Sequence, residues 1–289
     1  MWRFDDRFLT KLEYLRVVSR RAFAGRDRAD RLSRKRGRGL EFADYRAYAH
    51  GDDIRHIDWK AYKRLNRLLL RLFDEEQDLA IYLFVDASAS MADHGKFDQA
   101  RRIAAALCYI GLVHLDRITI LPFGSRLLPE TVPGRGRARI VPVFTALDRL
   151  KPHGGTDLVQ SFRQFAARAR QRGLAVVISD FLDPAGFEAG LRMLASTRHD
   201  VCAVHVVSER DGQVDAAGDV RVVDVETNES RSVEITPGLA AAYARAWQEH
   251  AADVEAFCRR YRIAYVRATA EEPFEDVMLR TFREGGLVA

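Results

Sequence analysis

From residue 79 onward, apolar segments of strand length alternate with segments of helical periodicity, and this alternation constrains the fold more than any other feature of the chain. Continuously apolar strands are typical of a parallel sheet that is covered on both faces. The predicted strands span residues 79–85, 117–122, 174–179, 201–207 and 263–267. We therefore predict an α/β fold with a mostly parallel sheet and helices on both faces.

Helices are predicted at 96–115, 140–150 and 158–171, with a short hairpin around Gly124 before the second of them. A further helix carries a stripe of residues spaced by three and four, which is typical of a face turned to the core. The stripe consists of Leu239, Tyr243, Trp247, His250, Val254, Phe257 and Tyr261. We interpret His250 as a core-edge residue rather than a ligand.

The first 76 residues have a different pattern. Apolar residues at helical spacing predict a helix over 7–18, and an arginine-rich, glycine-punctuated stretch up to Gly39 indicates a loop. Two extended segments, 40–48 and 67–73, follow. We therefore predict a small α+β appendage, residues 1–76, ahead of a main domain, residues 77–289.

Composition sets limits on location. The start of the chain is rich in charged residues and lacks the apolar centre of a signal peptide. The longest apolar run, 103–113, is well short of the roughly 20 residues that cross a bilayer. The cysteines, Cys108, Cys202 and Cys258, are far apart in apolar segments, as reduced core thiols would be. We expect a cytoplasmic protein without a membrane span.

Positive charge is concentrated between Arg20 and Arg38, although the net charge of the whole chain is only +5. This stretch could contact nucleic acid, anionic lipid or an acidic protein. It lacks the regular interleaving of aromatic residues that a single-strand binder needs, and it fits a solvated connector equally well. We expect no nucleic-acid partner and leave peripheral membrane association open.

Polar residues gather where predicted strands end, which is where open α/β sheets bind ligands. The first strand runs into Asp86, Ser88 and Ser90, a DxSxS arrangement; a glycine-containing loop before a helix carries Thr156; and another strand runs into Asp180. Two carboxylates and three hydroxyls are oxygen donors that suit a hard cation. We predict a Mg²⁺ site, with Mn²⁺ or Ca²⁺ as alternatives.

These residues, in this order, resemble the metal-ion-dependent adhesion site of von Willebrand factor A domains. The resemblance implies a von Willebrand factor A-like fold in which Ser88, Ser90 and Thr156 contact the metal and Asp86 and Asp180 act directly or through water. In such sites the metal binds a carboxylate of a partner. Asp157, next to Thr156, is better explained as a helix N-cap because Gln160 follows three residues later.

A second signature precedes the main domain and resembles the bacterial "domain of unknown function fifty-eight" family. It comprises Gly39, Glu41, Phe42, Arg46, Tyr48, Gly51, Asp52, Asp53, Arg55, Ile57, Asp58 and Trp59. Members of that family usually lie beside MoxR-type AAA+ ATPases, so the resemblance implies such an ATPase, or a client that it remodels, as the partner.

Six residues of this signature are candidate partner contacts: Arg46, Asp52, Asp53, Arg55, Asp58 and Trp59. We favour a structural explanation, in which ion pairs of Asp52, Asp53 and Arg55 stabilise a turn and Trp59 packs between the appendage and the main domain.

The leading hypothesis is a non-enzymatic adaptor that binds a partner carboxylate through Mg²⁺. One alternative is a metal-dependent phosphohydrolase or nuclease, disfavoured because only two carboxylates converge and the motif places no lysine or histidine base. Another is a nucleic-acid binder that uses residues 20–38. The chain has no GxxxxGK[ST] loop, so we do not expect it to hydrolyse ATP itself.

Overall fold

The computed structural model describes residues 8–15, 36–49, 52–74, 80–129, 134–169, 171–226 and 229–284. Its contacts divide the chain into two compact units, one of Met1–Ala22 with Leu79–Ala289 and one of Phe23–Asp78. We call them the main unit and the small unit. Of the basic segment 20–38, residues 20–35 lie outside the described residues, so its proposed roles stay predictions.

The main unit is built on a five-stranded sheet in the order β4-β3-β5-β6-β9. Every neighbouring pair of its strands is parallel. The strands are β3 (Ala80–Asp86), β4 (Arg117–Phe123), β5 (Gly173–Ser179), β6 (Asp200–Val207) and β9 (Ala264–Thr269). The predicted fold class, an α/β domain with a mostly parallel sheet, is confirmed. Parallel pairing brings the carboxyl ends of all five strands to one edge.

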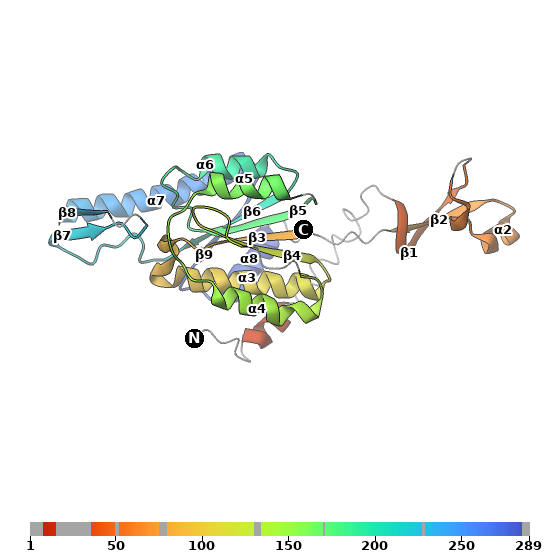
Figure 1. Ribbon diagram of the computed structural model, residues 1–289, viewed down its shortest axis with the longest axis horizontal. Coiled ribbons are helices and arrows are strands. Elements are labelled where there is room, and N and C mark those ends of the chain that lie inside the picture. Colours follow the sequence, from red (N-terminus) through yellow and green to blue (C-terminus); the bar gives the residue numbers. More distant parts are fainter. Residues whose placement is uncertain are drawn as a thin grey trace. The chain divides into compact units, whose positions relative to one another are not determined.

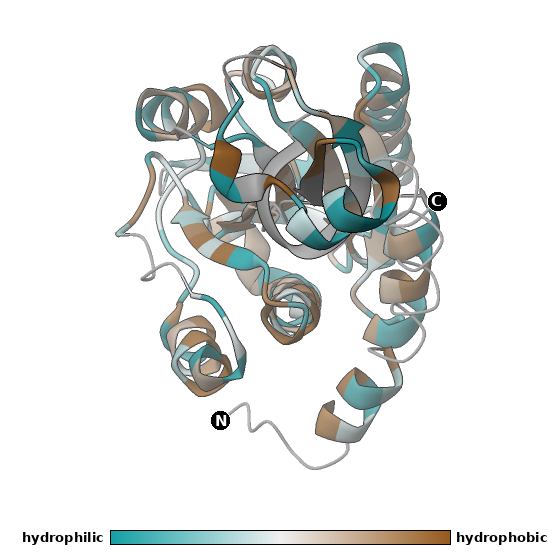
Figure 2. Ribbon diagram, turned by 90° about the vertical axis from the view of Figure 1, so that its right-hand side faces the viewer, coloured by the Kyte–Doolittle hydropathy of each residue, from teal (hydrophilic) through white to brown (hydrophobic). Residues whose placement is uncertain are grey.

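Helices cover both faces of this sheet (Figure 1). They are α3 (Lys96–Val113), α4 (Ile140–Arg149), α5 (Leu158–Arg168), α6 (Glu188–Ala195), α7 (Pro237–Arg260) and α8 (Phe274–Glu284). In Figure 1, α3 and α4 lie on one side of the sheet and α5 and α6 on the other. Ribbons of several helices alternate between brown and teal in Figure 2, as expected of amphipathic helices.

Aromatic residues fill the core between the sheet and α5. Phe84 of β3 contacts Phe162 and Phe165 of α5 edge-on, with ring centroids 5.1 and 4.9 Å apart. On the other face α3 approaches the sheet closely at Gly111. A Cβ added at this glycine would lie 2.5 Å from Cδ1 of Ile118, so a larger residue would not fit without a shift. Both sides of the central strands are therefore buried, which explains why these strands lack the apolar–polar alternation of half-exposed ones.

A helix over residues 8–15, within the predicted 7–18, belongs to the main unit. Phe8, Leu12 and Leu15 are buried, and the Phe8 ring lies 4.9 Å from that of Phe274 in α8. This helix therefore groups with the main unit and not with the rest of the predicted appendage, because its apolar residues are buried in the main unit.

Neither the hairpin of β7 and β8 nor the exposure of the first half of α7 was predicted from the sequence. Strands β7 (Gly218–Val223) and β8 (Ser230–Ile235) pair antiparallel and project beyond the sheet beside the start of α7, at the left of Figure 1. The predicted core-facing stripe of α7 is therefore wrong in its first half, where Leu239 and Tyr243 are 41% and 46% exposed. Only the second half reaches the core, through Val254.

The small unit contains strands β1 (Arg36–Ala47) and β2 (Leu69–Asp74), which pair antiparallel, and helix α2 (Trp59–Leu65). These strands match the two predicted extended segments. Among the described residues, no helix is both long and apolar enough to span a bilayer.

Candidate adhesion-type metal site

The DxSxS loop leaves β3 at the carboxyl edge of the sheet. Asp86 is the last residue of the strand, and its Oδ1 accepts a hydrogen bond from the backbone N–H of Ser88 at 2.9 Å. This bond folds the chain back so that the two serine side chains lie together, with 3.0 Å between their Oγ atoms. The loop thus presents two hydroxyls side by side.

Asp180 follows β5, the strand next to β3, and its side chain is fully buried. The Ser90 hydroxyl donates to its Oδ1 at 3.4 Å, and Nζ of Lys96 donates to its Oδ2 at 2.8 Å. Asp180 therefore lies at the same edge of the sheet as the two serines, as the sequence predicts for strands that run parallel.

Asp86 is buried beside this second carboxylate. Its Oδ2 accepts a hydrogen bond from the hydroxyl of Ser179, the last residue of β5. Burial raises the pKa of Asp86 to about 7, with the negative charge of Asp180 adding to the rise and the hydrogen bonds from Ser179 and Ser88 opposing it. The negative charge of Asp180, which contributes to this rise in the pKa, would also stabilise a bound cation.

The loop that carries Thr156 is joined to the DxSxS loop through the backbone. The N–H of Ala89 donates to the carbonyl of Gly154, and the N–H of His153 donates to the carbonyl of Ala87, each at 2.8 Å. The loop ends at Asp157, whose Oδ1 accepts from the N–H of Gln160 at 2.7 Å, so Asp157 caps α5 as the sequence indicates.

Thr156 itself contacts a residue that the sequence analysis missed. Its backbone N–H donates to Oε2 of Glu226 at 3.2 Å, and its hydroxyl donates to Oε1 at 3.1 Å. Glu226 lies in the loop between β7 and β8. Burial raises its pKa, and the hydrogen bonds from Thr156 oppose that rise.

Lys96 adds a buried positive charge to the site. Its Nζ also lies 3.7 Å from Oδ1 of Asp211, and it faces the ring of Trp247 at 5.7 Å. Burial lowers the pKa of Lys96, but the attraction of Asp180, with a further contribution from Asp211, outweighs it, so the pKa is raised overall. Lys96 is therefore a protonated ammonium that balances part of the carboxylate charge.

Four residues were thus added by the structure: Ser179, Lys96, Asp211 and Glu226. Ser179 and Lys96 had a usable signal, since one ends a predicted strand and the other begins the helix after the DxSxS loop. Asp211 follows the predicted strand 201–207 by four residues, whereas Glu226 had no signal because it lies in a region with no predicted element.

The spacing of two of the candidate donors, the Ser88 and Ser90 hydroxyls, suits a Mg²⁺ ion. Adjacent ligands of an octahedral ion with bonds of roughly 2.1 Å lie about 3.0 Å apart, which matches the separation of the two serine hydroxyls. In the described parts of the chain, no three or more His, Cys, Asp or Glu side chains form a metal-holding group. A metal at this edge would therefore need hydroxyl ligands, and Ser88, Ser90 and Thr156 can supply them.

The signature residues of the small unit form local structure. Arg46 pairs with Asp52 at 2.7 Å, and Arg55 pairs with Asp53 at 2.7 Å. The backbone N–H of Ala49, as the largest cause, and the Arg46 side chain hold the pKa of Asp52 below its ordinary value. These ion pairs fit the structural explanation of this segment.

Asp58 caps α2, accepting from the N–H groups of Lys60 and Ala61 at 2.9 and 3.0 Å. Trp59 is 59% exposed and contacts Tyr62 edge-on within the small unit. Its packing against the main domain stays a prediction.

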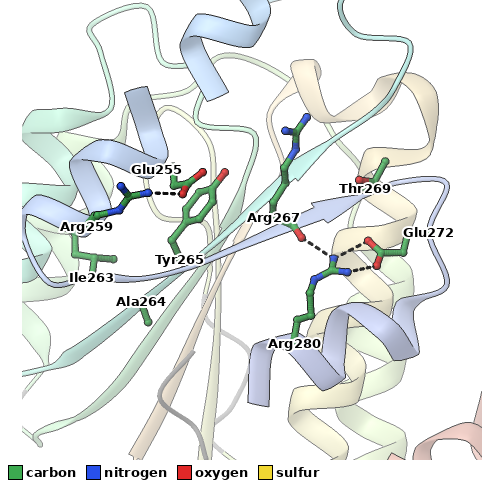
Figure 3. Close-up of a pocket in the computed structure, with 9 residues that line it drawn as sticks. All are labelled: Glu255, Arg259, Ile263, Ala264, Tyr265, Arg267, Thr269, Glu272 and Arg280. Atoms are coloured by element: carbon green, nitrogen blue, oxygen red, sulfur yellow. Dashed lines mark hydrogen bonds and ion pairs between the residues drawn. The ribbon is translucent and has the colours of Figure 1, made fainter. Parts of the chain in front are cut away.

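A separate pocket of about 620 Å³ lies along β9 (Figure 3). Two of its guanidinium groups are paired with carboxylates, since Arg280 bonds Glu272 and Arg259 bonds Glu255. Arg280 also donates to the backbone carbonyl of Arg267 at 2.8 Å. The last of these bonds occupies a backbone carbonyl of β9, which is an edge strand of the sheet.

Fold and geometry therefore define an α/β domain with clustered oxygen donors at the carboxyl edge of a parallel sheet. The family described as "Protein of unknown function DUF58" matches residues 44–253, and the chain belongs to this family. It is 30% identical over 258 residues to "Uncharacterized protein Mb1516" of Mycobacterium bovis, a match that covers 86% of this chain and 81% of that protein. "Uncharacterized protein Rv1480" of Mycobacterium tuberculosis matches with the same identity and coverage.

Solved structures give similarities at lower identity. A protein described as BatB from Bacteroides thetaiotaomicron is 12% identical, with a TM-score of 0.42, over 72% of this chain and 99% of that one. A von Willebrand factor type A protein from Catenulispora acidiphila is also 12% identical, with a TM-score of 0.41, over 74% of this chain and 44% of that one.

Proposed function

We propose that the chain is a metal-dependent binding module, in which Mg²⁺ held by Ser88, Ser90 and Thr156, with Asp86 and Asp180 bound directly or through water, captures a carboxylate of a partner protein. The observation that carries this proposal is the pair of serine hydroxyls, 3.0 Å apart, next to the buried carboxylate of Asp180. Hydroxyl ligands are neutral, so the ion keeps positive charge for an incoming anion.

Lys96 supports a binding role in two ways. It neutralises part of the charge of Asp180, which leaves less negative charge to repel a partner carboxylate. Because its pKa is raised, it is a poor general base. The presence of a lysine at the site therefore does not favour the phosphohydrolase or nuclease alternative.

The partner that family resemblance suggests is a MoxR-type AAA+ ATPase or a client protein that it remodels. A module of this kind would use an acidic side chain of the partner as a further ligand of the metal. The role proposed is thus that of an adaptor, with no chemical step performed by this chain.

Calorimetric binding to the ATPase tests this proposal. Association is expected in Mg²⁺ and lost in EDTA, and Mg²⁺ added in excess of EDTA should restore it. Ca²⁺ should substitute imperfectly, since it prefers longer bonds and more ligands. In the double variant Ser88→Ala/Ser90→Ala, binding should be lost while the fold persists, because the two hydroxyls bond each other and are removed together.

Ser232→Ala provides a matched control, since Ser232 is an exposed serine on β8. Binding of this control should equal that of the unaltered chain. Equal affinity in Mg²⁺, in EDTA and in the double variant would overturn the carboxylate-bridge mechanism.

A further inference from the structure

The hydroxyl of Thr156, one of the proposed metal ligands, is engaged by a carboxylate of the chain itself. Glu226 receives hydrogen bonds from both polar groups of Thr156, the backbone N–H at 3.2 Å and the hydroxyl at 3.1 Å. A partner's glutamate or aspartate would have to approach the same hydroxyl, since it would bind the metal that this hydroxyl helps to hold. The two carboxylates would therefore compete for one place.

The Thr156 loop leaves room for this contact. A Cβ added at Gly155 would lie 3.3 Å from Oε2 of Glu226, which is closer than most real Cβ contacts. The backbone of Glu226 is held as well, because its N–H donates to Oδ1 of Asp224 at 2.8 Å. Glycine at position 155 and the turn at Asp224 thus both position the carboxylate against Thr156.

The hairpin that carries Glu226 is well placed to move. No residue of β7 or β8 is buried, and the two strands pair with each other rather than with the main sheet. Exposed segments with few buried apolar contacts open at low free energy. Withdrawal of the hairpin would therefore leave the core of the main unit unchanged.

We propose that Glu226 is an internal carboxylate ligand of the adhesion-type site, so that a partner carboxylate binds only when the β7–β8 hairpin withdraws. This inference rests on the proposed function and names the regulation of the same site. A ligand that binds only the open fraction of a protein has its apparent affinity reduced by that fraction. If Glu226 occupies the site nine-tenths of the time, its removal strengthens carboxylate binding about tenfold.

The test uses the full chain with Mn²⁺ as the metal and acetate as the carboxylate. The relaxation rate of water protons reports the water bound to Mn²⁺. Acetate that coordinates the ion displaces this water and lowers the relaxation rate. The half-saturating acetate concentration is measured for the unaltered chain, for Glu226→Gln and for Glu234→Gln. Glu234 is an exposed residue of β8 on the same hairpin, so both variants remove one negative charge from it.

Glu226→Gln should lower the half-saturating acetate concentration about tenfold, while Glu234→Gln should stay close to the unaltered chain. Gly155→Ala provides a second variant that keeps every charge. Its added methyl group should weaken the hydrogen bonds from Thr156 to Glu226. The half-saturating acetate concentration should therefore fall, as in Glu226→Gln.

Three outcomes distinguish the two proposals. If Mn²⁺ binds and acetate displaces water equally in Glu226→Gln and Glu234→Gln, the internal-ligand inference is overturned and the adhesion-type site stands. If Mn²⁺ binds but acetate displaces no water even in Glu226→Gln, carboxylate capture itself fails. If Mn²⁺ binds to none of the proteins, the metal site fails and the inference falls with it.

Discussion

Nζ of Lys96 lies 2.8 Å from Oδ2 of Asp180, and the two side chains are only 3% and 0% exposed. The pair joins the first residue of α3 to the residue that follows β5, and so holds the DxSxS side of the site against the Asp180 side. A buried pair of this kind leaves an uncompensated charge when one partner is removed. It therefore ties the stability of the domain to the charge of the site.

Replacing Lys96 with Met should destabilise the chain by about 3 kcal/mol without metal, because the carboxylates of Asp180 and Asp211 then lack their buried cation. Bound Mg²⁺ would supply that charge, and a ligand that binds the folded state raises the free energy of unfolding. The variant should therefore gain more stability from Mg²⁺ than the unaltered chain does. Urea unfolding with and without Mg²⁺ measures both quantities.

Lys151→Met, at an exposed lysine, serves as the control for that experiment and should change little. The same Mg²⁺-dependent gain in Lys96→Met and in the unaltered chain would show that Lys96 does not share the site with the metal.

His205 should make the domain sensitive to acid. Its side chain is fully buried on β6, its Nδ1 lies 3.0 Å from the hydroxyl of Tyr265, and among the described residues its Nε2 has no hydrogen-bond partner. Burial, with the charges of His250 and Arg267 as smaller causes, lowers its pKa to about 3. The unfolded chain therefore binds a proton below about pH 6.5 that the folded chain does not.

The free energy of unfolding should accordingly fall as the pH drops from 6.5 toward 3, by up to about 1.4 kcal/mol per pH unit from this residue. Asp86, whose pKa is raised to about 7, acts in the opposite direction. His205→Asn removes the contribution of His205 and keeps that of Asp86. Urea unfolding at pH 7.5, 6.5, 5.5 and 4.5 should therefore show that, as the pH falls, the unaltered chain loses free energy of unfolding relative to the variant. Parallel curves for the two proteins would contradict the account.

Asp58 should stabilise the small unit through α2. Besides capping the helix, its Oδ2 accepts from the hydroxyl of Tyr45 at 2.8 Å. Asp58→Ala should cost about 1 to 2 kcal/mol, which corresponds to roughly a tenfold loss of amide protection in α2 by hydrogen exchange. Asp58→Asn keeps the capping oxygen and should lose less. Unchanged protection in both variants would show that the cap is not needed.

The sheet and most of the candidate site could be predicted because both follow from the pattern of a parallel sheet buried on both faces. Strands buried on both faces are continuously apolar, and parallel strands end at one edge, so Asp86 and Asp180 had to be neighbours wherever the strands paired. The three polar residues of the DxSxS motif are local in sequence, so their proximity at the end of β3 could be predicted from their spacing.

The rest depended on positions that no local pattern encodes. Glu226 reaches Thr156 only because a hairpin of mostly exposed residues folds back beside the sheet edge. The apolar stripe of α7 was also a poor guide, since Leu239 and Tyr243 in the first half of this helix are exposed. Helical periodicity identifies an apolar face but does not say whether the sheet extends far enough to cover it.

Calorimetric titration of the purified chain with Mg²⁺ tests the central claim most directly. The account predicts saturable binding of one ion to the unaltered chain and to Ser232→Ala, and no binding to Ser88→Ala/Ser90→Ala, whose thermal unfolding should remain close to that of the unaltered chain. Absence of Mg²⁺ binding in the unaltered chain, or equal affinity in the double variant, would contradict the account.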